Sequence, residues 1–159
     1  MSESQEFCAP EPTSQHKWLA QLVGEWEYTG GEDHPVNGTE SVRAFGDLWI
    51  MAEGQGAMPN GEPSGSCFTI GYDPEKGKFV STWIGTMMCN LWICEGDLSE
   101  NGKVLTLNSR GPSMSGDGSM ANYRDMIEIV SPTKRLLRAE MQGEDGTWSE
   151  FMRTTYVRV

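Results

Sequence analysis

The sequence has few of the residues from which metal and haem sites are usually built. Its 159 residues include four cysteines and two histidines. The cysteines form no CxxC pair, and neither His16 nor His34 lies at a zinc-ligand spacing from them. His34, in the expected loop GGEDHPVNG, is of a type that could ligate haem iron, but a loop histidine is far more often only exposed to solvent. We therefore expect no metal and no cofactor.

Long apolar runs are also missing. No run approaches the roughly 18 residues that a membrane-spanning helix needs. The N-terminal stretch MSESQEFCAPEPTSQ has neither the basic nor the apolar segment of a signal peptide. We expect residues 1–13 to be a disordered tail and the protein to be cytoplasmic.

Basic residues are scarce. The chain has 12 Lys and Arg against 23 Asp and Glu, which gives a net charge of −11 at pH 7. A surface of this charge repels nucleic acid phosphates and anionic lipid headgroups. We expect neither a nucleic acid nor a membrane as a partner.

Glycine is plentiful, with 19 residues, and turn signals separate short strand-like runs along most of the chain. Before them, Trp18, Leu19, Leu22 and Val23 form one apolar stripe of a short helix over residues 14–23, which Gly24 can end. The expected strands span residues 25–29, 39–45, 48–55, 66–72, 78–84, 90–97, 104–109, 120–130, 135–142 and 147–157. Turns such as 73–77, 99–102 and 143–146 carry glycine where a positive φ is needed.

Ten strands joined by short turns imply antiparallel neighbours. A flat sheet of this size would have two open edges, and closure removes them. The sequence therefore predicts an all-β fold, an up-and-down antiparallel barrel of about ten strands, with the short N-terminal helix over one mouth. Residues 14–159 would form this single domain, and a β-sandwich is the alternative. A barrel of this strand number leaves a cavity inside.

The segment Gly24-Glu25-Trp26 resembles the Gly-x-Trp signature of lipocalin-like barrels. In that family the tryptophan lies at the closed end of the barrel, and an arginine near the last strand packs across its ring. The resemblance implies that Arg158, or else Arg153, makes this cation–π contact here. Gly24, Trp26 and Arg158 are thus expected to have a structural role.

A wider resemblance extends from Gln15 to Val159. It is carried by HKWLAQLVGEWEY, GTESVRAFGDLWIMAEG, IGYDPEKGKFVSTWIGTMM, LWICEGDL, LTLNSRGP, YRDMIEIV and GEDGTWSEFM, which are similar to the DUF1579 family. That family is generally bacterial, has no characterised function and is similar in shape to lipocalin and fatty-acid-binding barrels. The resemblance supports the fold and implies no catalytic residues.

Two expected strands, residues 48–55 and 90–97, are apolar on both faces. One face of each looks into the barrel, so the other needs cover. We expect a homodimer whose interface includes this region; the alternative is that the N-terminal tail or helix folds over it. Cys89 and Cys94 point to opposite faces of the second strand, so free buried thiols are expected.

Polar and aromatic residues within strands are the candidates for a binding site. Carboxylates recur at mid-strand positions, namely Glu40, Glu53, Glu95, Asp125, Glu128 and Glu150. Arginine partners are expected for any carboxylate that points inward. The residues chosen as pocket candidates are Arg43, Trp49, Glu53, Trp83, Met87, Asn90, Trp92, Tyr123, Arg124 and Glu150.

The favoured function is a barrel that binds a small apolar or amphipathic molecule in its interior. The alternative is an enzyme, an isomerase or hydrolase, that uses an interior carboxylate. No nucleophile–base pair is visible in the sequence, so no catalytic residue is named.

Overall fold

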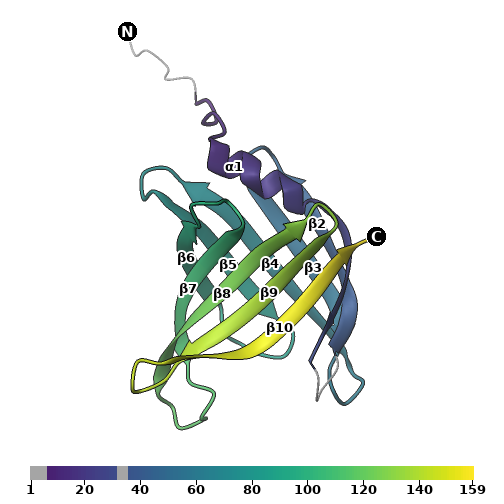
Figure 1. The fold of residues 1–159 in the computed structure, drawn as a ribbon, viewed down its shortest axis with the longest axis vertical. Coiled ribbons are helices and arrows are strands. Elements are labelled where there is room, and N and C mark those ends of the chain that lie inside the picture. Colours follow the sequence, from purple (N-terminus) through teal and green to yellow (C-terminus); the bar gives the residue numbers. More distant parts are fainter. Residues whose placement is uncertain (1–6, 32–35) are drawn as a thin grey trace.

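A computed structural model describes residues 7–31 and 36–159 of the chain. Figure 1 shows a short helix at one end of a barrel of strands. The elements are α1 (Ser14–Leu19), the 3-10 turn η1 (Ala20–Leu22), β1 (Gly24–Gly30), β2 (Val36–Phe45), β3 (Trp49–Ala57), β4 (Pro63–Asp73), β5 (Lys78–Gly85), β6 (Trp92–Leu98), β7 (Val104–Pro112), β8 (Met120–Ser131), β9 (Lys134–Gln142) and β10 (Trp148–Arg158). His34 and residues 1–6 lie outside the described residues.

The ten strands form one closed antiparallel barrel in which each strand pairs with its sequence neighbours. Closure comes from β1 and β10, where Trp26 pairs with Arg158 and Gly30 with Thr154. The predicted up-and-down barrel is therefore confirmed, and the sandwich alternative is excluded. Every strand has two partners, so no sheet edge is left open along the wall.

Three strands extend further than their sequences indicate. β2 begins at Val36 rather than residue 39, β4 begins at Pro63 rather than 66, and β7 runs to Pro112 rather than 109. Proline and glycine have low strand propensity, which hides these ends in the sequence. Both prolines stand at strand ends, where the missing N–H is tolerated.

The helix ends earlier than predicted, because Ala20–Leu22 tightens into a 3-10 turn. Thr13 caps α1, and its backbone N–H donates in return to the His16 ring at 2.9 Å. Trp18 Nε1 donates to the Gly102 carbonyl at 2.8 Å, which holds the helix against the β6–β7 turn. In the described ranges, no helix is long and apolar enough to cross a membrane.

The end of the barrel beneath α1 is closed by Trp26 and two arginines. The Cζ atom of Arg158 lies 4.3 Å from the Trp26 ring centroid, and that of Arg135 lies 4.6 Å from it. Arg158 also donates to the carbonyls of Val23 and Gln21, at 2.7 and 2.8 Å. Gly24 has a φ of 142°, and a Cβ there would overlap the Arg158 guanidinium, so glycine is needed at this position.

All four cysteines are free thiols. Cys94 is buried, Cys67 is half-buried, and Cys8 and Cys89 are exposed. The prediction of buried thiols is wrong for Cys8 and Cys89, which are exposed. Cys8 precedes the helix, and Cys89 lies in the connection before β6, which begins only at Trp92.

Candidate ligand-binding site

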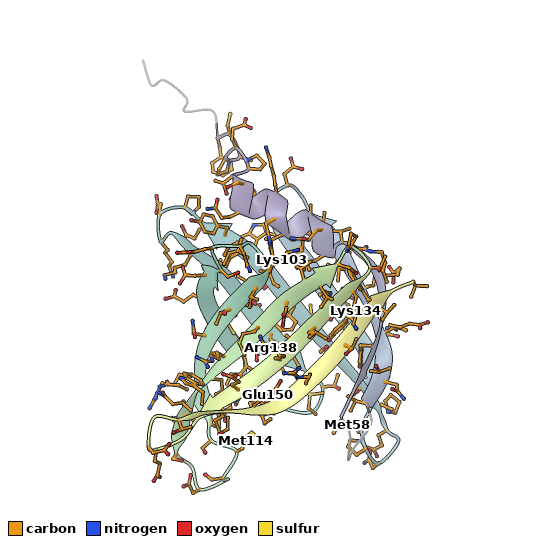
Figure 2. All side chains as sticks on the ribbon, in the orientation of Figure 1. Met58, Lys103, Met114, Lys134, Arg138 and Glu150 are labelled. Atoms are coloured by element: carbon orange, nitrogen blue, oxygen red, sulfur yellow. The ribbon has the colours of Figure 1, made fainter. Side chains whose placement is uncertain are left out.

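The barrel is hollow over much of its length. A cavity of about 720 Å³ extends from the interior to the end opposite α1. Met58 and Met114, which line its mouth, lie at that end in Figure 2. A volume of several hundred Å³ is typical of sites for small organic molecules.

The cavity wall is mainly aromatic and methionine-rich. Trp92 packs edge-on against Tyr123 at a centroid distance of 5.1 Å, and Tyr123 packs against Phe151 at 6.0 Å. On the other side, Phe68 and Trp83 are 6.3 Å apart. The methionines of the lining are Met58, Met87, Met88, Met114 and Met152. Because methionine side chains adapt to different shapes, this mouth can accept apolar groups of varied outline.

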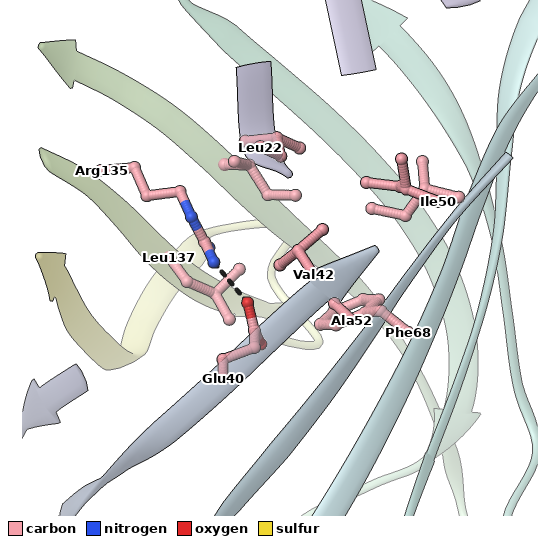
Figure 3. A pocket seen from close by; sticks show the side chains of 10 residues that line it. Leu22, Glu40, Val42, Ile50, Ala52, Phe68, Arg135 and Leu137 are labelled. Atoms are coloured by element: carbon pink, nitrogen blue, oxygen red, sulfur yellow. Dashed lines mark hydrogen bonds and ion pairs between the residues drawn. The ribbon is translucent and has the colours of Figure 1, made fainter. Parts of the chain in front are cut away.

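A buried ion pair forms the floor of the cavity. Glu40 from β2 and Arg135 from β9 are 5% and 4% exposed, and the guanidinium donates to the carboxylate. Arg135 also lies 3.9 Å from the Tyr156 ring centroid. Figure 3 shows this pair beside a small void of about 20 Å³, bounded by Leu22 on the helix side. The pair thus separates this water-sized void from the large cavity.

A second carboxylate, Asp125 of β8, also lines the cavity wall. In the register it stands between Leu107 of β7 and Ala139 of β9, both of which are buried. No hydrogen bond or ion pair joins its side chain to another described residue. Asp125 is therefore a partly buried carboxylate on the cavity wall whose side chain has no hydrogen-bond or ion-pair partner among the described residues.

Burial changes the acidity of the groups around this point. Desolvation raises the pKa of Asp125 from 3.8 to about 6. It also raises the pKa of the neighbouring Cys94 thiol to about 11, an effect that the Asp125 charge reinforces. Burial raises the pKa of Tyr156 as well, with Glu40 adding to the shift. At neutral pH the thiol and the phenol keep their protons, and Asp125 is mostly ionised.

Five of the residues predicted from the sequence line the cavity: Trp83, Met87, Asn90, Trp92 and Tyr123. The Tyr123 hydroxyl donates to the Pro112 carbonyl at 2.5 Å, and Trp92 Nε1 contacts Met88 Sδ at 3.1 Å. These contacts tie the wall to the loops at the mouth. Tyr123 is buried, whereas Met87 is 42% exposed at the rim.

Three other predicted residues face outward, and their assignment to the pocket is wrong. Arg43 and Glu53 form an ion pair of 3.4 Å on the outer surface, with each side chain about half exposed. Trp49 is 43% exposed, and its ring lies over Gly71 of the adjacent strand. Strand β3 instead turns its smaller residues, among them Ile50 and Ala52, toward the interior.

Arg124 and Glu150 are also on the outer surface. Arg124 pairs with Glu140 and lies 4.2 Å from the Trp148 ring centroid. Glu150 would face inward by simple alternation with Met152, but the register shifts between these two residues. This bulge turns Glu150 outward to Arg153, at 2.8 Å, and brings Phe151 to the cavity wall.

The residues with the greatest chemical interest, Glu40 and Asp125, were absent from the predicted pocket set. Both stood out as mid-strand carboxylates, but Glu53, Glu95, Glu128 and Glu150 shared that property. One signal did distinguish Asp125. It shares a strand face with Tyr123, so the choice of Tyr123 as inward implied Asp125 as well.

The ionisable groups of the site bear on metal binding and on proton transfer. In the part of the chain that the structure describes, no group of three or more His, Cys, Asp or Glu could hold a metal ion. Asp125 has a pKa suited to proton transfer near neutrality. No described side chain hydrogen-bonds to this carboxylate.

Comparison with solved structures supports the fold. The crystal structure of Rv2717c from M. tuberculosis matches with a TM-score of 0.61 and 14% identity, over 94% of this chain and 99% of that chain. The S-type phycobiliprotein lyase CPES from Guillardia theta matches with a TM-score of 0.57 and 14% identity, over 90% of this chain and 91% of that chain. At this identity the likeness shows a shared barrel and nothing more.

No curated protein sequence matches this chain significantly. A family model does: the profile described as "Protein of unknown function (DUF1579)" matches residues 11–158, which is nearly the whole chain. The chain therefore belongs to the DUF1579 family, as its sequence motifs indicated.

Proposed function

We propose that this protein binds a small, largely apolar molecule inside its barrel. The observation that carries the proposal is the cavity of about 720 Å³, open at one end and walled by aromatic and methionine side chains. Apolar surface of this extent gains free energy when a ligand removes it from water. The structural relative CPES is described as a phycobiliprotein lyase, which is consistent with small-molecule handling by such barrels.

The proposal is tested with Nile red, a neutral dye whose emission rises in apolar surroundings. We expect one dye to bind per chain. Ala139 is a small, buried residue of the cavity wall, so Ala139→Trp fills the space and should weaken dye binding by about tenfold or more.

Asn108→Trp provides the matched control for this experiment. Asn108 is exposed on the outer face of β7, so the added indole does not enter the barrel. We expect this variant to bind Nile red as the unaltered protein does. Equal loss in both variants, or no loss in either, would contradict a site inside the barrel.

We further propose that the protein is a homodimer formed through the outer face of β5 and β6. Ile84, Leu91 and Ile93 are 53%, 59% and 69% exposed there, and Trp49 adds to the same side from β3. Positive and negative side chains border this face as ion pairs, such as Lys76–Glu95 and Lys78–Asp97. An apolar centre with mixed charge at its rim fits a second copy of the chain.

Native mass spectrometry reads the oligomeric state directly. We expect a species of twice the chain mass, and we expect Ile93→Glu to shift it to the single-chain mass because a buried charge without a partner is costly. Val157→Glu makes the same type of change at an exposed position of β10, away from β5 and β6, and serves as the surface variant outside the proposed interface. A single-chain mass for the unaltered protein at micromolar concentration would overturn the proposal.

A further inference from the structure

The charged residues that line the cavity are all acidic. Among the described residues, its lining includes two carboxylates, Glu40 and Asp125, and no lysine, arginine or histidine. Arg135 lines the small void and not the large cavity; it pairs with Glu40 and stacks on Tyr156, and its buried Nε has no hydrogen-bond partner among the described residues. The cavity therefore offers acceptors without an available cation.

This set of charged residues disfavours anionic ligands. A carboxylate brought into the barrel would meet the charge of Asp125, because that of Glu40 is neutralised by Arg135. No guanidinium or ammonium group of the described lining would compensate for its lost hydration. The overall net charge of −11 acts in the same direction on the approach to the mouth. A barrel with these residues is thus poorly suited to a fatty acid, despite its shape.

Asp125 is the residue of the lining that can accept a hydrogen bond from a ligand's polar group or pair with a positive charge on it. Its carboxylate lines the cavity and has no hydrogen-bond or ion-pair partner among the described side chains. Ser109, which also lines the cavity, lies on the adjacent strand β7. A partly buried carboxylate that has lost hydration and has no protein partner gains free energy when a ligand donor reaches it.

We propose, as an extension of the binding function above, that the ligand is an apolar amine whose protonated nitrogen pairs with Asp125. The hydrocarbon part lies among Trp83, Trp92 and the methionines of the mouth. The amine supplies the positive charge that the described lining lacks, and its N–H groups donate to the Asp125 carboxylate. Because Asp125 is partly buried inside the barrel, the pair is stronger than one formed on the outer surface.

The test uses three probes with the same ten-carbon chain: decylamine, decanol and decanoate, each kept below its micellar concentration. Binding is measured by isothermal titration calorimetry in about 0.3 M salt, which screens attraction to exposed charges. We expect decylamine to bind at least about tenfold more tightly than decanol, and decanoate to bind most weakly.

Asp125→Asn should remove this preference while the cavity stays the same size. We expect it to weaken decylamine binding by about tenfold and to leave decanol binding unchanged. Asp97→Asn makes the same change in net charge on the outer surface, where Asp97 pairs with Lys78 at 2.6 Å. This control should bind all three probes as the unaltered protein does.

The preference should also depend on pH. The titratable groups that face or adjoin Asp125 are Cys94 from β6, Tyr123 from β8, Tyr156 from β10 and the Glu40–Arg135 pair. Burial raises the pKa of Asp125 to about 6, so the carboxylate takes up a proton between pH 7 and pH 5. We expect decylamine affinity to fall over this range in the unaltered protein and to stay level in Asp125→Asn.

The outcomes separate this inference from the binding function. Equal affinity for decylamine and decanoate, or an unchanged decylamine affinity in Asp125→Asn, overturns the amine preference. If decanol still binds and Ala139→Trp still blocks it, the binding function stands without the preference. Failure of all three probes to bind overturns both.

Discussion

Replacing Arg135 by methionine is expected to lower the free energy of unfolding by about 3–5 kcal/mol. The change leaves the Glu40 carboxylate, only 5% exposed, without its partner beneath α1. It also removes the guanidinium contacts with Trp26 and Tyr156, at 4.6 and 3.9 Å. Urea denaturation followed by tryptophan fluorescence measures the loss.

Two further variants show whether burial of the pair is the cause. Arg138→Met removes a guanidinium from the outer wall, where Arg138 is 3.4 Å from Glu128 and more exposed, and should cost less than about 1 kcal/mol. Glu40→Leu combined with Arg135→Met removes both buried charges and should recover most of the lost stability. Equal losses for Arg135→Met and Arg138→Met would contradict a structural role for the buried pair.

Asp125→Asn is expected to stabilise the protein at pH 7.5 by up to about 3 kcal/mol and to change its stability little at pH 4. The folded-state pKa of about 6 lies above the ordinary 3.8, so the folded protein holds this proton more tightly than the unfolded chain does. Stability from this group is therefore complete below about pH 4 and is lost as the pH rises through 6. Asparagine keeps the shape and removes the charge.

The free energy of unfolding is measured for the variant and for the unaltered protein at each pH, and the difference is taken. Other carboxylates titrate in both proteins, so their contributions cancel in this difference. Asp97→Asn again serves as the control, and its difference should not follow the same profile. An Asp125→Asn variant that is less stable at pH 7.5 than at pH 4, relative to the unaltered protein, would contradict an unpaired ionised Asp125.

A residue that costs stability when the barrel is empty is typical of a functional position. The two carboxylates of the cavity illustrate the contrast. Glu40 is compensated by Arg135 and belongs to the structure of the closed end. Asp125 has no such partner among the described residues. A ligand that carries a positive charge would therefore gain binding free energy from an ion pair with the Asp125 carboxylate.

The barrel itself was accessible from the sequence, because turn glycines and alternating runs are local signals. Gly77, Gly102 and Gly146 have positive φ values of 64°, 69° and 83° at the predicted turns. The helix was found from its apolar stripe, although its last turn is 3-10, and the carbonyls of Gln21 and Val23 accept from Arg158, which is distant in sequence. Local patterns therefore predicted the elements and their order.

The interior could not be predicted to the same extent, because period-two alternation does not say which face of a strand is inside. Trp49 looked like a core residue, yet the wall at β3 turns Ile50 and Ala52 inward. The bulge at Glu150 reverses the alternation without a clear sequence mark. The pairing of Glu40 with Arg135, 95 positions apart, depends on barrel closure and has no local signature.

A crystal structure of the protein grown with decylamine tests the central claim, a hollow barrel that holds an apolar amine, most directly. We expect electron density inside the cavity, with the carbon chain beside Trp83 and Trp92 and the nitrogen within hydrogen-bond distance of the Asp125 carboxylate. An interior filled by side chains, or decylamine found only on the outer surface, would contradict it.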